Sequence, residues 1–209
     1  CVGGSEGRGF PPTGPAGTIV LMGDSQATMY GVLLRDLAEE AQKRLVVLCQ
    51  AGKDPLVNGG LWESNFRRIQ AERPDSVVLA CHWDKLPQEP SRLAETLERL
   101  KPQVGRIILL TMPPDRPDLA SRESIRAGAR PPFFEKPDKR AFRQRFNELA
   151  KEQAAEKVHI LDTEPFFVRA DGSIRAFDSD GRALYYDQKH LSHLGVSEVK
   201  GAVRALFLK

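Results

Sequence analysis

Short apolar runs alternate with amphipathic segments along most of the chain. Five runs rich in Val, Ile and Leu predict buried strands, at residues 18–23, 45–49, 76–81, 106–112 and 158–162. Between and after these runs, apolar residues recur at helical spacing and predict helices, at residues 26–44, 63–73, 90–101, 138–156 and about 193–207. The stripe formed by Leu33, Leu34 and Leu37 is typical of these helices. The pattern therefore predicts a chain of alternating strands and helices.

This alternation indicates the fold class. Strands that are continuous apolar runs are buried on both faces, and the helices between them make the right-handed crossovers of a parallel sheet. We therefore expect an α/β fold, a three-layer α/β/α sandwich around a five-stranded parallel sheet. The chain has 209 residues, enough for one such domain, which we place at residues 18–209. Residues 1–17 are rich in Gly and Pro and are expected to form a flexible tail or linker.

Residues 113–136 form an irregular segment that is too long for an ordinary connection. Together with the start of the next helix, the segment carries more basic than acidic residues, and the basic ones are Arg116, Arg122, Arg126, Arg130, Lys136, Lys139 and Arg140. It follows the fourth strand and so lies at the edge of the sheet where the first strand ends. Two interpretations are open: a groove wall that meets an anionic glycan, or a solvated loop whose arginines pair with nearby acids.

Candidate catalytic chemistry begins where the first strand ends, in "IVLMGDSQATMYG" from Ile19 to Gly31. In open parallel sheets, functional side chains gather at the carboxyl ends of the strands. Ser25 lies between a strand and a helix, where a serine is either the cap of the helix or a nucleophile. Asp24 is expected to brace this turn through hydrogen bonds to nearby backbone.

A second polar segment precedes the last helix, in "YYDQKHLSHLGV". Asp187 stands three residues before His190, so its carboxylate can accept the proton of one ring nitrogen while the other nitrogen takes a proton from a serine. The alternative is a polar loop in which Ser192 caps the last helix. Because a nucleophilic serine needs a base and the base needs an orienting acid, the two segments together favour a Ser25–His190–Asp187 triad.

Gly-Asp-Ser after the first strand and Asp-x-x-His before the last helix resemble the SGNH hydrolase superfamily. The stretches "DGRALYYDQKHLSHLGV" and "VVLACHW" are similar to the SGNH domains attached to membrane acyltransferase-3 proteins, and the resemblance runs in order from residue 18 to the end. It implies the SGNH hydrolase fold, with a flavodoxin-like strand order 2-1-3-4-5. It also implies that Ser25 is the nucleophile, His190 the general base and Asp187 the residue that orients the base.

The resemblance further implies an oxyanion hole. Its expected donors are the N–H of Ser25, at a helix N-terminus, and the N–H of Gly52 in "CQAGKD". The family usually adds an asparagine after the third strand, but this sequence has "LACHWDKL", with His82 at that place. The His82 ring either donates the third hydrogen bond or packs on Trp83 as a loop residue. The candidate substrate-binding residues are Trp83, Tyr185 and Tyr186. Alternatively, the two tyrosines cover the catalytic loop.

Three functions fit these features. The first is serine-dependent O-acyl transfer, with acetyl as the expected acyl group, on a cell-envelope carbohydrate through an acyl-Ser25 intermediate. The second is hydrolysis of a carbohydrate acetyl ester, or of another acyl ester, through the same intermediate. The third, which the missing asparagine motivates, is a glycan-binding module that has lost catalysis. The resemblance implies a membrane acyltransferase domain or protein as acyl donor and an extracytoplasmic location, in the periplasm or cell envelope.

Composition and spacing exclude several other classes. The net charge of +3 is mild and no nucleic-acid-binding motif is present, so no nucleic-acid partner is expected. No Cys/His spacing fits a zinc site and no glycine-rich nucleotide fingerprint occurs, so neither a metal nor a cofactor is expected. Cys1 precedes a stretch rich in Gly and Ser, and it is interpreted either as a lipid attachment site or as the boundary of a cut chain.

Cys49 and Cys81 each end an apolar run and are expected to be small buried residues. In the implied strand order they lie two strands apart, about 10 Å. A disulfide needs Cα atoms within about 7 Å, so both are expected to be thiols.

Overall fold

The computed structural model describes residues 8–9, 17–83 and 89–207, and its sheet confirms the predicted one. The five predicted strands are β2 Thr18–Gly23, β3 Arg44–Cys49, β4 Ser76–Ala80, β5 Arg106–Leu110 and β6 Val158–Leu161. They pair in parallel in the order β3-β2-β4-β5-β6, which is the predicted 2-1-3-4-5 order. A short strand, β1 Arg8–Gly9, adds to the edge by pairing antiparallel with β3. It lies within the expected tail and is too short to give an apolar pattern, whereas Cys1 lies outside the described residues.

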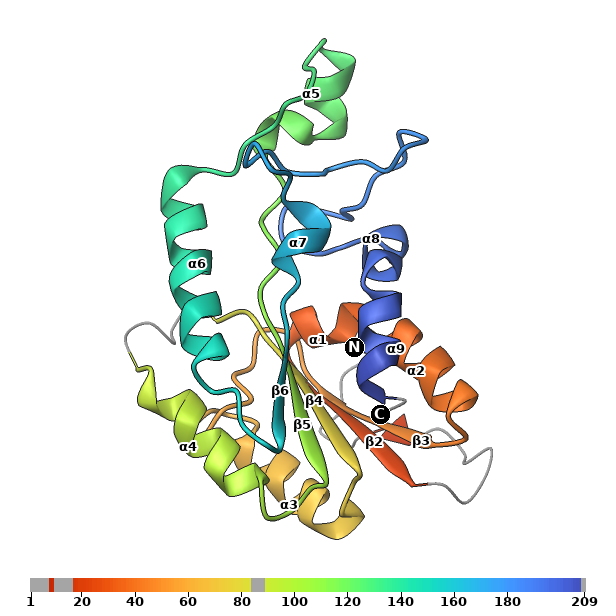
Figure 1. Cartoon of the computed structure of the whole chain (residues 1–209), viewed down its shortest axis with the longest axis vertical. Helices are drawn as coiled ribbons and strands as arrows, with labels where there is room; N and C mark the ends of the chain where they lie inside the picture. Colours follow the sequence, from red (N-terminus) through yellow and green to blue (C-terminus); the bar gives the residue numbers. More distant parts are fainter. Residues whose placement is uncertain (1–7, 10–16, 84–88, 208–209) are drawn as a thin grey trace.

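Helices cover both faces of the sheet, which gives the predicted three layers (Figure 1). One face is covered by α1 Ser25–Met29, α2 Gly31–Glu40, α8 His193–Glu198 and α9 Lys200–Phe207. The other face is covered by α3 Trp62–Glu72, α4 Ser91–Leu100 and α6 Pro137–Lys151. Because successive strand residues point to opposite faces, Ile19 and Leu21 join the first core, and Val20 and Met22 the second. Within the described residues, no helix has both the length and the apolar character needed to cross a bilayer.

Two of the predicted helices are each divided in the structure. Helices α1 and α2 meet at Tyr30, whose N–H bonds to the carbonyls of Ala27 and Thr28 and ends the first helix. Helices α8 and α9 meet in the same way at Val199. Both junction residues are buried. The apolar stripe therefore continues through each break, which is why the sequence pattern predicts a single helix in both places.

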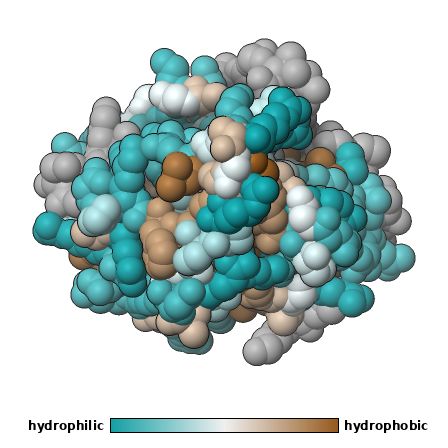
Figure 2. All heavy atoms as spheres, turned by 90° about the horizontal axis from the view of Figure 1, so that it is seen from above, coloured by the Kyte–Doolittle hydropathy of each residue, from teal (hydrophilic) through white to brown (hydrophobic). Residues whose placement is uncertain are grey.

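The irregular segments lie beyond the sheet (Figure 1). Residues 113–136 include the short helices η1 Asp118–Ala120 and α5 Arg122–Arg126, and α7 Glu164–Phe167 follows β6. Figure 2, seen from above, shows that the surface at this end is largely hydrophilic, with small apolar groups between the polar side chains. The end of the molecule at which the long connections lie therefore has a mostly polar surface.

The turn from β2 into α1 is unusually close to its neighbours. Gly23 has a φ of +157°, and a Cβ at this position would collide with the carbonyl of Ala80 and the side chain of Ala27. Glycine is therefore required for the backbone to approach β4 this closely. The approach sets Ser25 between the loops that follow β3 and β4.

Cys49 and Cys81 are both thiols, as predicted. Gly23 pairs with Cys49 on one side and with Ala80 on the other, so the two cysteines follow strands on opposite sides of β2. Burial raises the pKa of the Cys49 thiol to about 12, and the thiol is therefore protonated near neutral pH.

Candidate active site

Three polar side chains from opposite ends of the sequence meet at the carboxyl edge of the sheet. Nε2 of His190 lies 2.9 Å from Oγ of Ser25, and Nδ1 of the same ring lies 2.8 Å from Oδ2 of Asp187. In the tautomer with the proton on Nδ1, the ring donates to the carboxylate and Nε2 accepts from the serine hydroxyl. This arrangement can remove the hydroxyl proton as the oxygen attacks an electrophile.

Asp24, and not Ser25, is the cap of helix α1. Oδ1 of Asp24 accepts the N–H of Gln26 at 2.8 Å, while Oδ2 accepts the N–H of His82 at 2.8 Å. The aspartate thus braces the turn, as the sequence predicts, and also ties it to the segment after β4. Because the carboxylate satisfies the helix end, the hydroxyl of Ser25 is available to His190.

Asp187 organises the loop that carries His190. Its Oδ1 accepts the backbone N–H groups of Lys189 and His190, both at 2.8 Å, in addition to the ring contact. Partial burial by itself would raise the pKa of Asp187, but these hydrogen bonds outweigh it and hold the pKa below its usual value. The carboxylate is therefore ionised and fixed in place at neutral pH.

Helix α1 also holds the catalytic loop directly. Nε2 of Gln26 donates to the carbonyl of Lys189 at 2.8 Å, and the N–H of Leu191 contacts the sulfur of Met29 at 3.3 Å. Lys189 and Leu191 flank His190 in sequence, while Gln26 and Met29 follow Ser25 on the same helix. These contacts therefore hold the loop that carries His190 against the helix that begins at Ser25.

The long segment after β5 supports the catalytic loop from outside. The N–H of Arg116 donates to the carbonyl of Gln188 at 2.8 Å, and Nε2 of Gln188 donates to Oδ1 of Asp118 at 3.0 Å. Sequence analysis missed this role, because no pattern in an irregular segment shows which loop it contacts. The segment is part of the site's framework.

A cavity of about 290 Å³ opens beside Ser25 and His190. Gly52 and His82 line it with Ser25, so the structure brings together the three expected oxyanion donors. Gly52 has a φ of +69°, which favours glycine. The backbone N–H of His82 is committed to Asp24, so a hydrogen bond from His82 to a ligand in this cavity would come from the ring.

Trp83 lines the same cavity, where its ring stacks on Phe146 with centroids 4.5 Å apart. Arg92, from helix α4, lines it too, and it is a residue that sequence analysis missed. The guanidinium is held by Asp54 at 2.7 Å and by the carbonyl of Val57. Nothing near Arg92 in the sequence distinguishes it from other helix-surface arginines, because its partners lie on a distant loop.

Neither of the two tyrosines lines the described cavity beside Ser25. Tyr185 is 3% exposed, packs edge-on against Phe167 and lines neither this cavity nor the neighbouring one. Tyr185 is therefore a residue of the core. Tyr186 is 82% exposed and lines neither cavity.

Among the residues that the structure describes, no three His, Cys, Asp or Glu side chains are grouped as metal ligands. The described site consists of a hydroxyl, an imidazole, a carboxylate and hydrogen-bond donors. These groups are sufficient for acyl transfer through a serine ester.

Comparison with known families matches residues 1–205 to the SGNH domain that is fused to AT3 domains. A curated relative, the platelet-activating factor acetylhydrolase IB subunit alpha1 of Pongo abelii, is 40% identical over 68 residues, which are 32% of this chain and 27% of the relative. The chain thus spans about a quarter of the length of that relative.

Solved structures share the fold. The periplasmic domain of the lipopolysaccharide acetyltransferase from Salmonella ser. Paratyphi A has a TM-score of 0.72 at 14% identity, covering 92% of this chain and 84% of that chain. An acetyl-xylooligosaccharide esterase from Geobacillus stearothermophilus has a TM-score of 0.57 at 18% identity, covering 92% of this chain and 94% of that chain.

Proposed function

This chain belongs to the family of SGNH domains that are fused to AT3 domains, and we propose that it is a serine-dependent O-acyltransferase acting on a cell-envelope carbohydrate. The observation that supports this most is the line of contacts from Ser25 through His190 to Asp187. The acyl group is acetyl, the group handled by proteins of the same fold.

In the first step, Nε2 of His190 takes the proton of Ser25 while Oγ attacks the carbonyl carbon of the acyl donor. The oxyanion that forms receives hydrogen bonds from the N–H groups of Ser25 and Gly52 and from the His82 ring. Collapse breaks the bond to the donor's leaving group, which takes the proton from His190. The product of this step is acyl-Ser25.

In the second step, a sugar hydroxyl gives its proton to His190 and attacks acyl-Ser25. A second oxyanion forms in the same hole, and its collapse releases the acylated sugar and returns the proton to Ser25. Asp187 keeps the ring in the required tautomer throughout. Trp83 also lines this cavity, and in this proposal it contacts the acyl or sugar group.

The acyl donor in this proposal is a membrane acyltransferase domain or protein, because the family is defined by fusion to AT3 domains. The domain then works outside the cytoplasm, in the periplasm or cell envelope, as the similar Salmonella domain does.

Hydrolysis is the second candidate, and the exposure of the site supports it. The side chain of His190 is 30% exposed and that of Asp187 is 48% exposed, so water can reach acyl-Ser25. An acetyl ester offered with and without an oligosaccharide acceptor separates the two reactions. We expect acetylated oligosaccharide as a product, and formation of free acetate alone, whatever the acceptor, would reject the transferase.

A fluorophosphonate probe tests whether the protein is an enzyme of this class at all. We expect the probe to modify Ser25, as mapped by mass spectrometry, and Ser25→Ala to lower acetyl-ester turnover at least about 1000-fold. The melting temperature of the variant should stay within a few degrees of wild type. A folded wild-type protein without an adduct at Ser25 would instead support a glycan-binding module.

A further inference from the structure

A second cavity, of about 240 Å³, lies against the catalytic one and shares His82 with it. Its other lining residues come from the long segment after β5 and from the start of helix α6, and they include Met112, Asp115, Asp138, Lys139 and Phe142. A ligand in this cavity could therefore contact the same His82 that lines the Ser25 cavity. The proposed mechanism gives no role to this space.

Asp115 faces this cavity without a hydrogen-bond donor. Its backbone N–H donates to Oε1 of Glu135 at 3.0 Å, but among the described residues no N–H or O–H group donates to its carboxylate. Burial raises the pKa of the Asp115 carboxyl, opposed by the positive charges of Lys189, Lys139 and others nearby. A half-buried carboxylate that lacks donors gains most from a ligand that supplies them.

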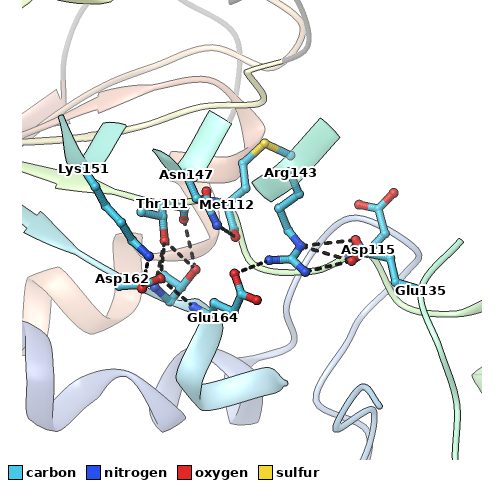
Figure 3. Close-up of polar contacts among 10 residues, drawn as sticks. Thr111, Met112, Asp115, Glu135, Arg143, Asn147, Lys151, Asp162 and Glu164 are labelled. Carbon is cyan, nitrogen blue, oxygen red and sulfur yellow. Dashed lines mark hydrogen bonds and ion pairs between the residues drawn. The ribbon is translucent and has the colours of Figure 1, made fainter. Parts of the chain in front are cut away.

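The buried charged side chains next to Asp115 already pair with one another. Nη2 of Arg143 donates to Oε2 of Glu135 at 2.9 Å, and Nη1 donates to Glu164 at 2.7 Å. The side chains of Arg143 and Glu135 are only 2% and 3% exposed. Figure 3 shows the arginine held between the two glutamates. Because these charges satisfy one another, Asp115 is the group in this wall that is left for a ligand.

We propose that this second cavity is the subsite for the sugar ring whose hydroxyl exchanges the acyl group with Ser25, and that Asp115 accepts hydrogen bonds from other hydroxyls of that ring. This inference rests on the proposed function. The side chains of Met112 and Phe142 offer an apolar surface to the C–H face of the ring. Lys139 and Asp138 stand at the rim as further polar partners.

The charges of the cavity favour a neutral sugar over an acidic one. Among the charged side chains that line this cavity, Asp115, Glu135 and Asp138 outnumber Arg143 and Lys139, and Arg143 is already bound by two glutamates. The charge of Lys189, which lines the Ser25 cavity, also acts on Asp115. A carboxylate or phosphate on the ring would face the unpartnered Asp115 and be repelled. Of the basic residues named for the long segment and the start of helix α6, Lys139 is the one that lines this cavity.

Matched pairs of acetyl esters test the subsite. The probes are singly O-acetylated methyl glucoside and methyl glucuronoside, the corresponding galactoside and galacturonoside, and 4-nitrophenyl acetate, which carries no sugar. For the wild-type protein we expect kcat/KM at least about tenfold higher for the neutral member of each pair. Asp115→Asn should lower kcat/KM for the neutral glycosides about tenfold to a hundredfold. It should change kcat/KM for 4-nitrophenyl acetate by no more than about twofold. The ratio of kcat/KM between the neutral and acidic member of each pair should therefore become smaller.

The control is Asp36→Asn, which changes an aspartate on helix α2 that pairs with Arg35 at the surface and should change none of these rates. Equal turnover of the neutral and acidic members by wild type, or an equal effect of Asp115→Asn on the glycosides and on 4-nitrophenyl acetate, would overturn the subsite. Ser25→Ala separates this failure from failure of the proposed function, because it should abolish turnover of every ester.

A second variant covers the case in which Asp115→Asn does not fold. Lys139 is exposed at the rim, near the start of helix α6, where a carboxylate is compatible with the helix dipole. Lys139→Glu should widen the neutral-to-acidic ratio several-fold and leave 4-nitrophenyl acetate turnover unchanged. An unchanged ratio in this variant would also overturn the proposal.

Discussion

Two neighbouring residues at this site have separate roles: one caps helix α1 and the other contacts the histidine. Asp24 caps helix α1 and fixes the His82 backbone, while Ser25 contacts His190. Asp187 likewise orders its own loop through two backbone N–H groups and orients the His190 ring with the same carboxylate. We therefore expect Asp187 to affect both the stability of the fold and ester turnover. Its effect on stability should depend on pH.

Asp187→Asn should lower kcat for an acetyl ester by roughly 100-fold to 10,000-fold, because an amide does not hold the ring in the required tautomer. Steady-state kinetics at pH 7 measure this. His193→Asn, at a nearby exposed histidine on helix α8, serves as the control and should retain activity. Wild-type kcat in Asp187→Asn would refute the orienting role.

The same variant has an expected dependence of stability on pH. The pKa of Asp187 is lower in the folded protein than in the unfolded one, so its ionised form stabilises the fold fully above the unfolded value of about 3.9. This contribution is lost as the pH falls through the lower, folded value. Thermal unfolding should therefore show Asp187→Asn slightly less stable than wild type at pH 7, with the difference closing below about pH 4. The difference is small because the side chain is half exposed; a gap that widens in acid would contradict the assignment.

At the scale of elements, the short helix α1 joins the parts of the site. Its cap Asp24 accepts a hydrogen bond from the segment after β4, Gln26 donates to the loop before α8, and Tyr30 joins α1 to α2. A five-residue helix has little stability of its own. Its position is therefore determined by these contacts, and loss of the cap should affect the geometry of the site as well as the fold.

Asp24→Ala should lower the free energy of unfolding by at least about 1–2 kcal/mol, the cost of a lost cap, and should also lower ester turnover because the His82 N–H loses its acceptor. Urea unfolding and kinetics measure both. Asp75→Ala removes the carboxylate that accepts the N–H of Thr18 at the opposite end of β2, and should leave turnover unchanged. Equal turnover in Asp24→Ala and Asp75→Ala would argue against a link through His82.

At the scale of the whole molecule, one buried ion-pair cluster fastens the long segment to the domain. Arg143 on helix α6 binds Glu135 of that segment and Glu164 of α7 (Figure 3). Burial alone would lower the pKa of Arg143, but the two glutamates outweigh it and raise the pKa. The arginine therefore stays charged, and the segment that supports the catalytic loop depends on it.

Arg143→Met should lower the free energy of unfolding by about 3–5 kcal/mol, because it leaves Glu135 buried without its partner. Arg99→Met is the matched control: it removes an exposed ion pair with Glu95 within helix α4 and should cost no more than about 0.5 kcal/mol. Denaturant unfolding measures the loss in free energy of unfolding of each variant relative to wild type. Similar losses in the two variants would show that the cluster does not anchor the segment.

The apolar pattern of the sequence predicted the strands, the helices and the layers, while the family resemblance implied the strand order and the candidate triad. Apolar runs of strand length and stripes of helical spacing are local properties, so each element could be predicted from its own residues. Ser25, Asp187 and His190 were identifiable because their motifs are also local, at a strand end and within four residues of each other. Even there, the pattern did not separate the cap from the nucleophile at the end of β2.

Only the tertiary structure decided which distant side chains share the site and which do not. Tyr185 and Tyr186 are the same residue type at neighbouring positions, yet Tyr185 is buried in the core and Tyr186 is exposed. Arg92, Gln188 and Asp115 gain their roles from partners or cavities built by other segments. Such contacts depend on how loops of no fixed periodicity fold over the sheet, and that arrangement is set by long-range packing and ion pairs, which no local pattern records.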